Sequence, residues 1–288
     1  MRVASGPGEL GPGPRAVALG TFDGVHLGHR RVIEKLLEAG PEPTVVTFDP
    51  HPRTALGNRV ELLATLERRL ELLDELGVAA ALVVEFTLEV ANLEPQEFAD
   101  QVLRPIGAET VVAGADFRFG RARRGDLATL ESLGFQTSPV AILEGISSTR
   151  IRELVREGDV KGAAQLLGRP IEVEGTVVTG DARGGTLGFP TANLDVRPEL
   201  LVPANGIYAG AALDHRAAVS IGTNPHYGGS ERRVEAFLLD YSGDLYGRRL
   251  IVELWSRLRD EQVFASEEEL VAQIARDVEL TRAADRPV

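Results

Sequence analysis

The first half of the chain alternates short apolar runs with amphipathic stretches. Val17–Gly20 is apolar and precedes a turn rich in glycine and histidine, after which His29–Ala39 has helical periodicity. Further strands and helices are expected at Thr44–Phe48, Leu66–Leu76, Ala80–Phe86, Gln96–Leu103, Thr110–Ala113, Ser138–Leu143 and Thr149–Glu157. Strands that alternate with helices predict a parallel, doubly wound α/β sheet.

The pattern changes near Gly168–Pro170. Beyond it, short strands separated by glycine-containing turns are expected at Glu172–Val178, Gly206–Leu213, Ala217–Ile221, Val234–Asp240 and Arg249–Leu258. These strands predict an antiparallel β-barrel, and Ser266 is expected to cap a final helix that runs to about Leu280. We therefore expect an α/β domain at residues 1–168 and a mainly β domain at residues 169–288.

Composition narrows the class of protein. The chain has 43 acidic and 31 basic residues, a net charge of −12, which argues against a protein that coats nucleic acid or an anionic membrane. It has no cysteine, which excludes disulfides and thiolate chemistry and fits a reducing compartment. Its longest purely apolar run, Val78–Val84, is too short to span a bilayer. We expect a soluble cytoplasmic protein without nucleic-acid or membrane partners, whose oligomeric state stays open.

The N-terminal segment contains a misleading motif. Gly6–Gly11 formally matches the dinucleotide-binding pattern G-x-G-x-x-G, but no strand is predicted before it and proline interrupts it. The first fifteen residues also lack the apolar core of a signal peptide. We expect this glycine- and proline-rich segment to be a flexible tail.

Lysine is almost absent, which restricts how phosphate can be bound. Only Lys35 and Lys161 are present, and neither lies in a Walker P-loop. Phosphate chemistry here must therefore use backbone N–H groups, hydroxyls, arginine, histidine or a metal.

The turn Gly20–His29 is the strongest candidate for such chemistry. It joins the first strand to the first helix, at the edge where open α/β sheets bind ligands. We expect Gly20, Phe22 and Gly28 to line a phosphate, with His26 and His29 donating to its oxygens. Two alternatives are that the histidines only order the turn, or that they bind a metal together with residues such as Asp23 and His51.

A second candidate is the helix start in Gly145–Arg152. Its hydroxyl groups, with Ser148 as the expected cap of the helix, are followed by arginines, and this combination suits a triphosphate. Ser and Thr also cap helices in many proteins, so this signal gains weight only beside the histidine turn.

Together these motifs resemble a known family. The H-x-G-H turn, the segments T-F-D-P-H-P at residues 47–52 and G-A-D-F-R-F-G at residues 114–120, and the I-S-S-T-R-I-R segment closely resemble bacterial bifunctional riboflavin kinase/FMN adenylyltransferases, also called FAD synthetases. The resemblance implies a nucleotidyltransferase-like fold for the first domain, with His26 and His29 at the ATP phosphates. Further ATP contacts are implied for Ser148, Thr149 and Arg152, and flavin contacts for Phe48, Asp49, Asp116 and Arg118.

The second half resembles the kinase part of the same family. Gly180–Asn193 is glycine-rich and ends in P-T-A-N. Gly180, Asp181 and Gly188 are expected to lie over phosphates, while Thr191 and Asn193 offer hard oxygen ligands for Mg²⁺. Without P-T-A-N, a plain barrel hairpin would be the simpler interpretation.

The resemblance also implies a general base for the kinase. In the resemblance, Glu235 in the segment V-E-A-F-L-L is the base that accepts the proton of the riboflavin 5′-hydroxyl. The alternative is that Glu235 is only a charged residue on a sheet edge. The chain departs from the family pattern at Gly185, where a basic residue is common, and at His226 and Tyr227, where Thr and Phe are usual.

The expected function is therefore FAD synthesis in two steps, with ATP and Mg²⁺. Riboflavin would be phosphorylated to FMN, and FMN would then accept AMP from a second ATP, which gives FAD and pyrophosphate. Alternatives are that only one activity survives, or that the chain is a catalytically dead flavin-sensing module. The partners expected are small-molecule substrates.

Overall fold

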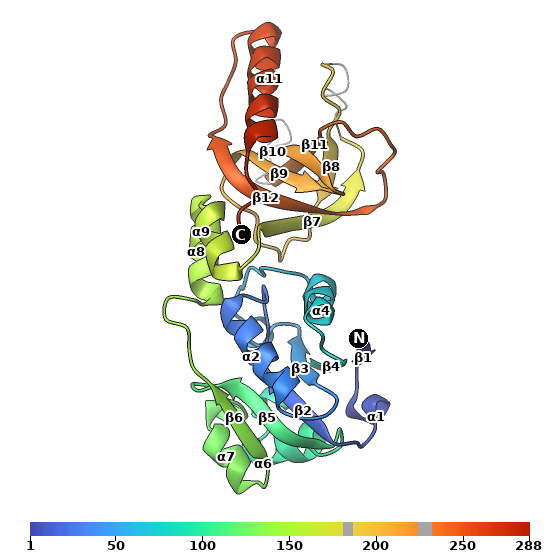
Figure 1. Cartoon of the computed structure of the whole chain (residues 1–288), viewed down its shortest axis with the longest axis vertical. Helices are drawn as coiled ribbons and strands as arrows, with labels where there is room; N and C mark the ends of the chain where they lie inside the picture. The colour runs from blue at the N-terminus through green and yellow to red at the C-terminus, as the bar shows by residue number, and fades with distance from the viewer. Residues whose placement is uncertain (181–186, 224–231) are drawn as a thin grey trace. The chain divides into compact units, whose positions relative to one another are not determined.

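The computed structural model describes residues 1–180, 187–223 and 232–288. The chain forms two compact units, Met1–Ser147 and Ser148–Val288, and Figure 1 colours them from blue to green and from yellow-green to red. The domain boundary predicted after residue 168 falls later than this division. Two helices lie between the two positions, α8 (Ser148–Glu157) and α9 (Val160–Leu167). Which function these helices serve stays a prediction.

A six-stranded parallel sheet forms the first unit. Its order is β1-β4-β3-β2-β5-β6. The strands are β1 (Arg2–Ala4), β2 (Arg15–Leu19), β3 (Thr44–Asp49), β4 (Ala80–Glu85), β5 (Ala108–Gly114) and β6 (Gln136–Val140). The helical segments are α1 (Pro7–Leu10), α2 (Leu27–Glu38), α3 (Pro52–Ala55), α4 (Leu66–Glu75), α5 (Leu88–Asn92), α6 (Pro95–Phe98), η1 (Ala99–Leu103), η2 (Arg121–Arg123) and α7 (Leu127–Ser132).

Both faces of this sheet are covered, as in a doubly wound fold. Along β2, Ala16 and Ala18 face the core that contains α2 and α4, whereas Val17 and Leu19 face the core that contains η1 and α7. Parallel strands buried on both sides read as continuous apolar runs, which is the pattern that the sequence presents. The predicted α/β fold of this unit is confirmed.

The prediction of a flexible N-terminal tail is wrong. Arg2–Ala4 pairs in parallel with Ala80–Leu82 and extends the sheet at its edge. Arg15 is buried and donates to the carbonyl oxygens of Leu10 at 3.2 Å and Gly11 at 2.8 Å, and to that of Ile106. Because these bonds satisfy the carbonyls at the C-terminal end of α1, the segment is fixed despite its glycine and proline content.

A close backbone contact beneath this segment gives a stability prediction. Gly107 has a φ of +69°, and a Cβ there would lie 2.1 Å from the Gly13 carbonyl oxygen. We expect Gly107→Ala to lower the free energy of unfolding of the first unit by at least about 2 kcal/mol, through backbone strain and overlap.

A matched control separates the two causes. Gly134 has a φ of +92° but nothing within 4 Å of an added Cβ, so Gly134→Ala should show the strain alone. Urea unfolding followed by circular dichroism measures both variants. Trp255, the single tryptophan, lies in the barrel and provides a fluorescence reference. Equal losses in the two variants would contradict the overlap.

The second unit is a closed antiparallel barrel with the strand order β10-β11-β8-β7-β12-β9. The strands are β7 (Ile171–Val178), β8 (Ala192–Asp195), β9 (Gly206–Ala212), β10 (His215–Thr223), β11 (Arg232–Leu238) and β12 (Arg249–Arg259). Alternate residues such as Val219, Val234 and Leu194 are buried and fill the interior. The predicted barrel is confirmed, with β8 as a strand that the sequence did not predict.

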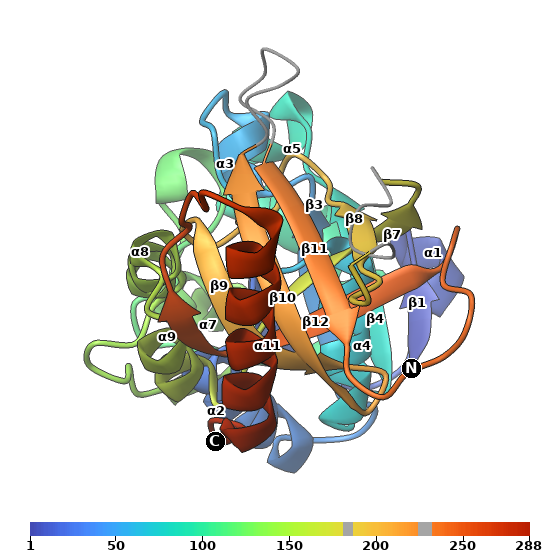
Figure 2. The same ribbon diagram turned by 90° about the horizontal axis from the view of Figure 1, so that it is seen from above.

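Helix α11 (Glu267–Ala283) packs against β9 and β10 and crosses in front of them in Figure 2. Ser266 caps it through the backbone N–H of Glu269, as predicted. Arg259 donates hydrogen bonds from Nε and Nη2 to the buried carboxylate of Asp277, the shortest at 2.7 Å. Arg216 donates to the carbonyls of Thr281 and Ala284 at the other end. No helix in the described parts of the chain is long and apolar enough to cross a membrane.

Candidate functional site

The first candidate site lies where β2 ends and α2 begins. In the sheet β2 lies between β3 and β5, and ligands of open α/β sheets bind at the carboxyl end where the strand order reverses. Gly20 follows β2, and the buried Phe22 adopts a left-handed φ of +50°. Gly28 is the second residue of α2. The first turn of this helix therefore offers backbone N–H groups to an anion at the edge of the sheet.

Two histidine rings stack at this helix start. His26 is the N-cap, and its Nδ1 accepts a hydrogen bond from the backbone N–H of His29 at 3.3 Å. The ring centroids lie 3.6 Å apart, with the planes inclined by 14°. Since Nδ1 of His26 accepts, the neutral ring carries its proton on Nε2, which makes Nε2 a donor.

His29 is electrostatically distinct from an ordinary histidine. Burial, followed by the neighbouring His26 and Arg69, holds the pKa of His29 well below its usual range. Its ring lies edge-on to Phe22, at 5.3 Å between centroids. At neutral pH His29 is therefore neutral, and it can stabilise phosphate charge by donating a hydrogen bond rather than as a cation.

The alternative of a metal at these histidines finds no support in the geometry. Asp23 is buried, and its carboxylate accepts hydrogen bonds from the backbone N–H groups of Leu63 at 2.9 Å and Ala64 at 3.2 Å. Within the described residues, no group of three or more His, Cys, Asp or Glu side chains is arranged to hold a metal ion. Asp23 instead fixes the turn before His26 against the segment that leads into α4.

The second candidate site lies on the outer face of the barrel. Glu235 on β11 is paired directly with Asn193 on β8 and with Ser220 on β10, so the three side chains share one face. Thr191 Oγ1 donates to the Glu235 carboxylate at 3.3 Å. The neighbouring residues Val234 and Ala236 point into the barrel. Because β11 lies between β8 and β10 in a closed barrel, the alternative of a charge on a sheet edge is wrong for Glu235.

A glycine makes room for the amide of Asn193. A Cβ on Gly180 would lie 2.3 Å from Asn193 Nδ2, so the Asn193 side chain rests directly against the Gly180 backbone. Close by, Phe189 meets Phe237 edge-on at 5.5 Å. Phe237 lies two residues after Glu235 and therefore on the same face, which adds an apolar wall to a polar centre. This aromatic pair was not predicted from the sequence.

Comparison with known proteins decides the family. A family model described as FAD synthetase matches residues 11–150, and one described as riboflavin kinase matches residues 167–284. The bifunctional riboflavin kinase/FMN adenylyltransferase of Listeria monocytogenes is 38% identical over 93% of this chain and 92% of its own length. The Escherichia coli K12 protein of the same name is 37% identical over 98% of this chain and 96% of its own.

The chain belongs to the bifunctional riboflavin kinase/FMN adenylyltransferase family. It is an enzyme that has both the riboflavin kinase and the FAD synthetase domain, so the predicted pair of activities is confirmed. A crystal structure of a Streptococcus pneumoniae protein named for macrolide efflux has the same fold. Its TM-score is 0.87, its sequence is 32% identical, and the match covers 97% of this chain and 98% of that one.

The predicted flavin residues lie at the same carboxyl edge as the histidine turn. Phe48 and Asp49 end β3, and Phe48 meets Phe86 edge-on at 5.4 Å. Asp116 is exposed just beyond β5. Arg118 is engaged with another acid, since its Nη1 lies 2.6 Å from Asp126 Oδ2.

Asp126 caps α7 and is thereby committed to the protein's own structure. Hydrogen bonds from the backbone and hydroxyl of Thr129, and then from Arg118, hold the pKa of Asp126 below its usual range. Through its ion pair with Asp126, Arg118 therefore stabilises the loop after β5, whether or not it also contacts a flavin.

The remaining predicted residues belong to the second unit or lie outside the described residues. Ser148 and Thr149 are the first two residues of α8, so Ser148 is the first helical residue rather than the cap. Arg152 is buried in the same helix. Gly188 has a φ of +87°. Asp181, Gly185, His226 and Tyr227 fall within residues 181–186 and 224–231, outside the described residues.

Proposed function

We propose that adenylyl transfer takes place at the start of α2, with His26 and His29 at the phosphates of ATP. An oxygen of the FMN phosphate attacks the α-phosphorus, a new P–O–P bond forms, and pyrophosphate leaves with the electrons of the broken bond. No covalent enzyme intermediate is needed. What the protein supplies is orientation and hydrogen-bond donors, namely the first N–H groups of α2, the His26 ring and the neutral His29 ring.

The substrates of this step would extend from that helix start along the sheet edge. We assign ATP contacts to Gly20, Phe22 and Gly28 in the turn, and to Ser148, Thr149 and Arg152 on α8. We assign flavin contacts to Phe48, Asp49, Asp116 and Arg118. The aromatic rings around Phe48 support this assignment, because an isoalloxazine ring needs an apolar, planar surface.

We further propose that riboflavin phosphorylation takes place on the outer face of the barrel, with Glu235 as general base. Glu235 accepts the proton of the 5′-hydroxyl while that oxygen attacks the γ-phosphorus of ATP and ADP leaves. Thr191 keeps the carboxylate in place through its 3.3 Å hydrogen bond. We assign phosphate contacts to Gly180, Asp181 and Gly188.

The donor set near Glu235 fits Mg²⁺. A hydroxyl and an amide oxygen on alternate residues of one segment are hard ligands, and Mg²⁺ bound with ATP keeps few protein ligands. Thr191 and Asn193 would hold the ion, which neutralises phosphate charge when bound. We propose that residues 1–168 and 169–288 divide the two reactions between them, in a cytoplasmic protein.

The observation that carries the kinase assignment is the convergence of Thr191, Asn193 and Glu235 on one face of the barrel. The whole scheme is tested by incubating the full chain with riboflavin and ATP, with and without Mg²⁺, and separating the flavins over time. We expect FMN to appear first and FAD to follow, and both to depend on Mg²⁺. FMN formed without added metal after chelation would contradict the Mg²⁺ assignment.

A further inference from the structure

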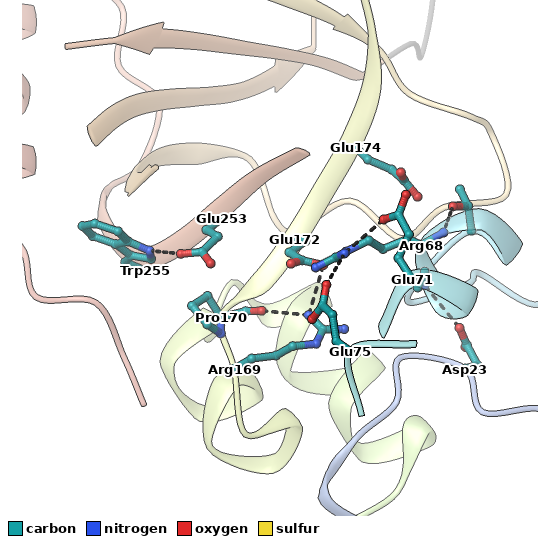
Figure 3. A network of polar contacts seen from close by, with 12 residues as sticks. Asp23, Arg68, Glu71, Glu75, Arg169, Pro170, Glu172, Glu174, Glu253 and Trp255 are labelled. Carbon is teal, nitrogen blue, oxygen red and sulfur yellow. Dashed lines mark hydrogen bonds and ion pairs between the residues drawn. The ribbon is translucent and has the colours of Figure 1, made fainter. Parts of the chain in front are cut away.

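Arg69 is a buried cation in a place where an apolar residue would be expected. It lies on α4 three residues after Leu66 and four before Leu73, on the apolar stripe of the helix, and only 4% of it is exposed. Its neighbour Arg68, in contrast, forms close ion pairs with carboxylates, with Glu71 at 3.0 Å and Glu75 at 3.2 Å (Figure 3).

The guanidinium of Arg69 joins the ends of two strands. Nη1 donates to the carbonyl oxygen of Thr21 at 2.6 Å, and Nη2 donates to that of Phe48 at 3.2 Å. Thr21 lies in the turn that follows β2 and leads to His26, and Phe48 is near the end of β3. A single side chain therefore ties the backbone of the histidine turn to the backbone of the segment assigned to flavin.

Two carboxylates, those of Asp23 and Asp49, act on this buried cation, and neither is bound by its two-nitrogen fork. Asp49 Oδ1 lies 3.9 Å from Arg69 Nη2, and the carboxylate of Asp23 accepts backbone N–H bonds from Leu63 and Ala64. Arg69 Nε is also buried without a hydrogen-bond partner in the described residues. Burial lowers the pKa of Arg69, although Asp23 and Asp49 act in the opposite direction. Burying such a charge costs stability, so a functional reason for keeping it is expected.

The position of Arg69 supplies that reason. We propose that Arg69 is a positioning residue for adenylyl transfer, which fixes the spacing between the histidine turn and the Phe48–Asp49 segment so that ATP and FMN meet in line. The proposal rests on the adenylyl-transfer site assigned above. Arg69 also acts on His29: after burial and His26, its charge further lowers the pKa of that ring.

Two substitutions separate geometry from charge. Arg69→Met keeps the bulk of the side chain and removes both hydrogen bonds and the charge, whereas Arg69→Lys keeps the charge but loses the planar fork. We expect Arg69→Met to lower the kcat of FMN adenylylation by about 10–100-fold, since small misplacements of reacting groups are costly. We expect Arg69→Lys to lower it by a smaller factor. In both variants KM for ATP should change less than kcat, and riboflavin phosphorylation by the same molecules should stay within twofold of the parent.

NMR titration of the His29 ring is a second readout. A distant loss of packing would not change the pKa of that ring. The pKa of His29 should rise in Arg69→Met, while burial and His26 still hold it below its ordinary value, and it should not rise in Arg69→Lys. Arg104→Met serves as the matched control, because Arg104 also donates to a backbone carbonyl, that of Leu133, but lies before β5 rather than at the carboxyl edge. It should leave adenylylation within twofold.

Several results would overturn the proposal. They are adenylylation within twofold of the parent in folded Arg69→Met, an equal loss of both activities, or a His29 pKa that does not move. If Arg69→Met does not fold, the Arg69→Lys variant tests the proposal instead. Full adenylylation activity in Arg69→Lys would show that the two-nitrogen guanidinium is not required. If His29→Ala were active while Arg69→Met was not, the assigned site would be at fault. If His29→Ala were inactive and Arg69→Met fully active, only the role of Arg69 would fail.

Discussion

Replacing Glu235 by glutamine is expected to lower the kcat of riboflavin phosphorylation by about 10²–10⁴-fold, the usual contribution of a positioned general base. Glutamine has nearly the same shape and can still accept the hydrogen bond from Thr191, so the face of the barrel should keep its geometry. It cannot take the proton of the 5′-hydroxyl at neutral pH. KM for riboflavin and ATP should therefore change little while kcat falls.

Steady-state kinetics of both reactions on the purified variant measure this effect. Adenylylation of supplied FMN should continue at the parental rate, because its assigned residues lie on the parallel sheet and on α8. Glu253→Gln is a matched control on the same barrel, since Glu253 is a strand glutamate whose carboxylate is bound by Arg286 and Trp255. It should retain kinase turnover. A kinase kcat within threefold of the parent in Glu235→Gln would remove Glu235 from the mechanism.

The elements that the sequence predicted are those with long apolar patterns of their own. The central strands of the sheet and the long strands of the barrel each contain several consecutive or alternating buried residues, which is a local signal. Strand β8 has four residues and is defined by its pairing with β7 and β11 rather than by its own pattern. Helix α9 was also missed, although Val160, Ala163, Ala164 and Leu167 are buried at helical spacing behind the capping Asp159.

The N-terminal segment shows how distant contacts override composition. Glycine and proline in the first fifteen residues predicted disorder, yet Arg2–Ala4 gains a partner in β4, and Arg15 satisfies the carbonyls of Leu10 and Gly11. The strand partner of Arg2–Ala4 lies far away in the sequence, and the carbonyls of Leu10 and Gly11 depend on one buried arginine. No local pattern reports them.

The candidate sites were predictable as motifs and not as contacts. The turn with His26 and the P-T-A-N segment could be named from residue types, but the stacking of the two histidines and the pairing of Arg118 with Asp126 depend on the folded backbone. Arg69 left one signal that was not used, a charged residue at the helical spacing of Leu66 and Leu73. A cation on an apolar stripe is a reason to look for backbone acceptors nearby.

His29→Ala is expected to lower the rate of FAD formation from FMN by about 10²–10³-fold and to leave FMN formation from riboflavin unchanged. The substitution removes one preorganised donor from the place where phosphate charge develops, and losses of this size are typical for such a donor. The helix should survive, because alanine is the best helix former and the backbone N–H that His26 Nδ1 accepts is retained.

Two comparisons make the His29 result interpretable. His215→Ala removes a histidine from β10, where its Nδ1 lies 3.1 Å from the Leu239 carbonyl oxygen, and it should leave adenylylation unchanged. His26→Ala should be more damaging to structure than His29→Ala, because it also removes the helix cap, at a cost of about 1 kcal/mol. Melting temperatures of the three variants separate this loss of stability from a loss of rate. An equal fall of both activities in a folded His29→Ala variant would refute the division of the two reactions between the sheet and the barrel.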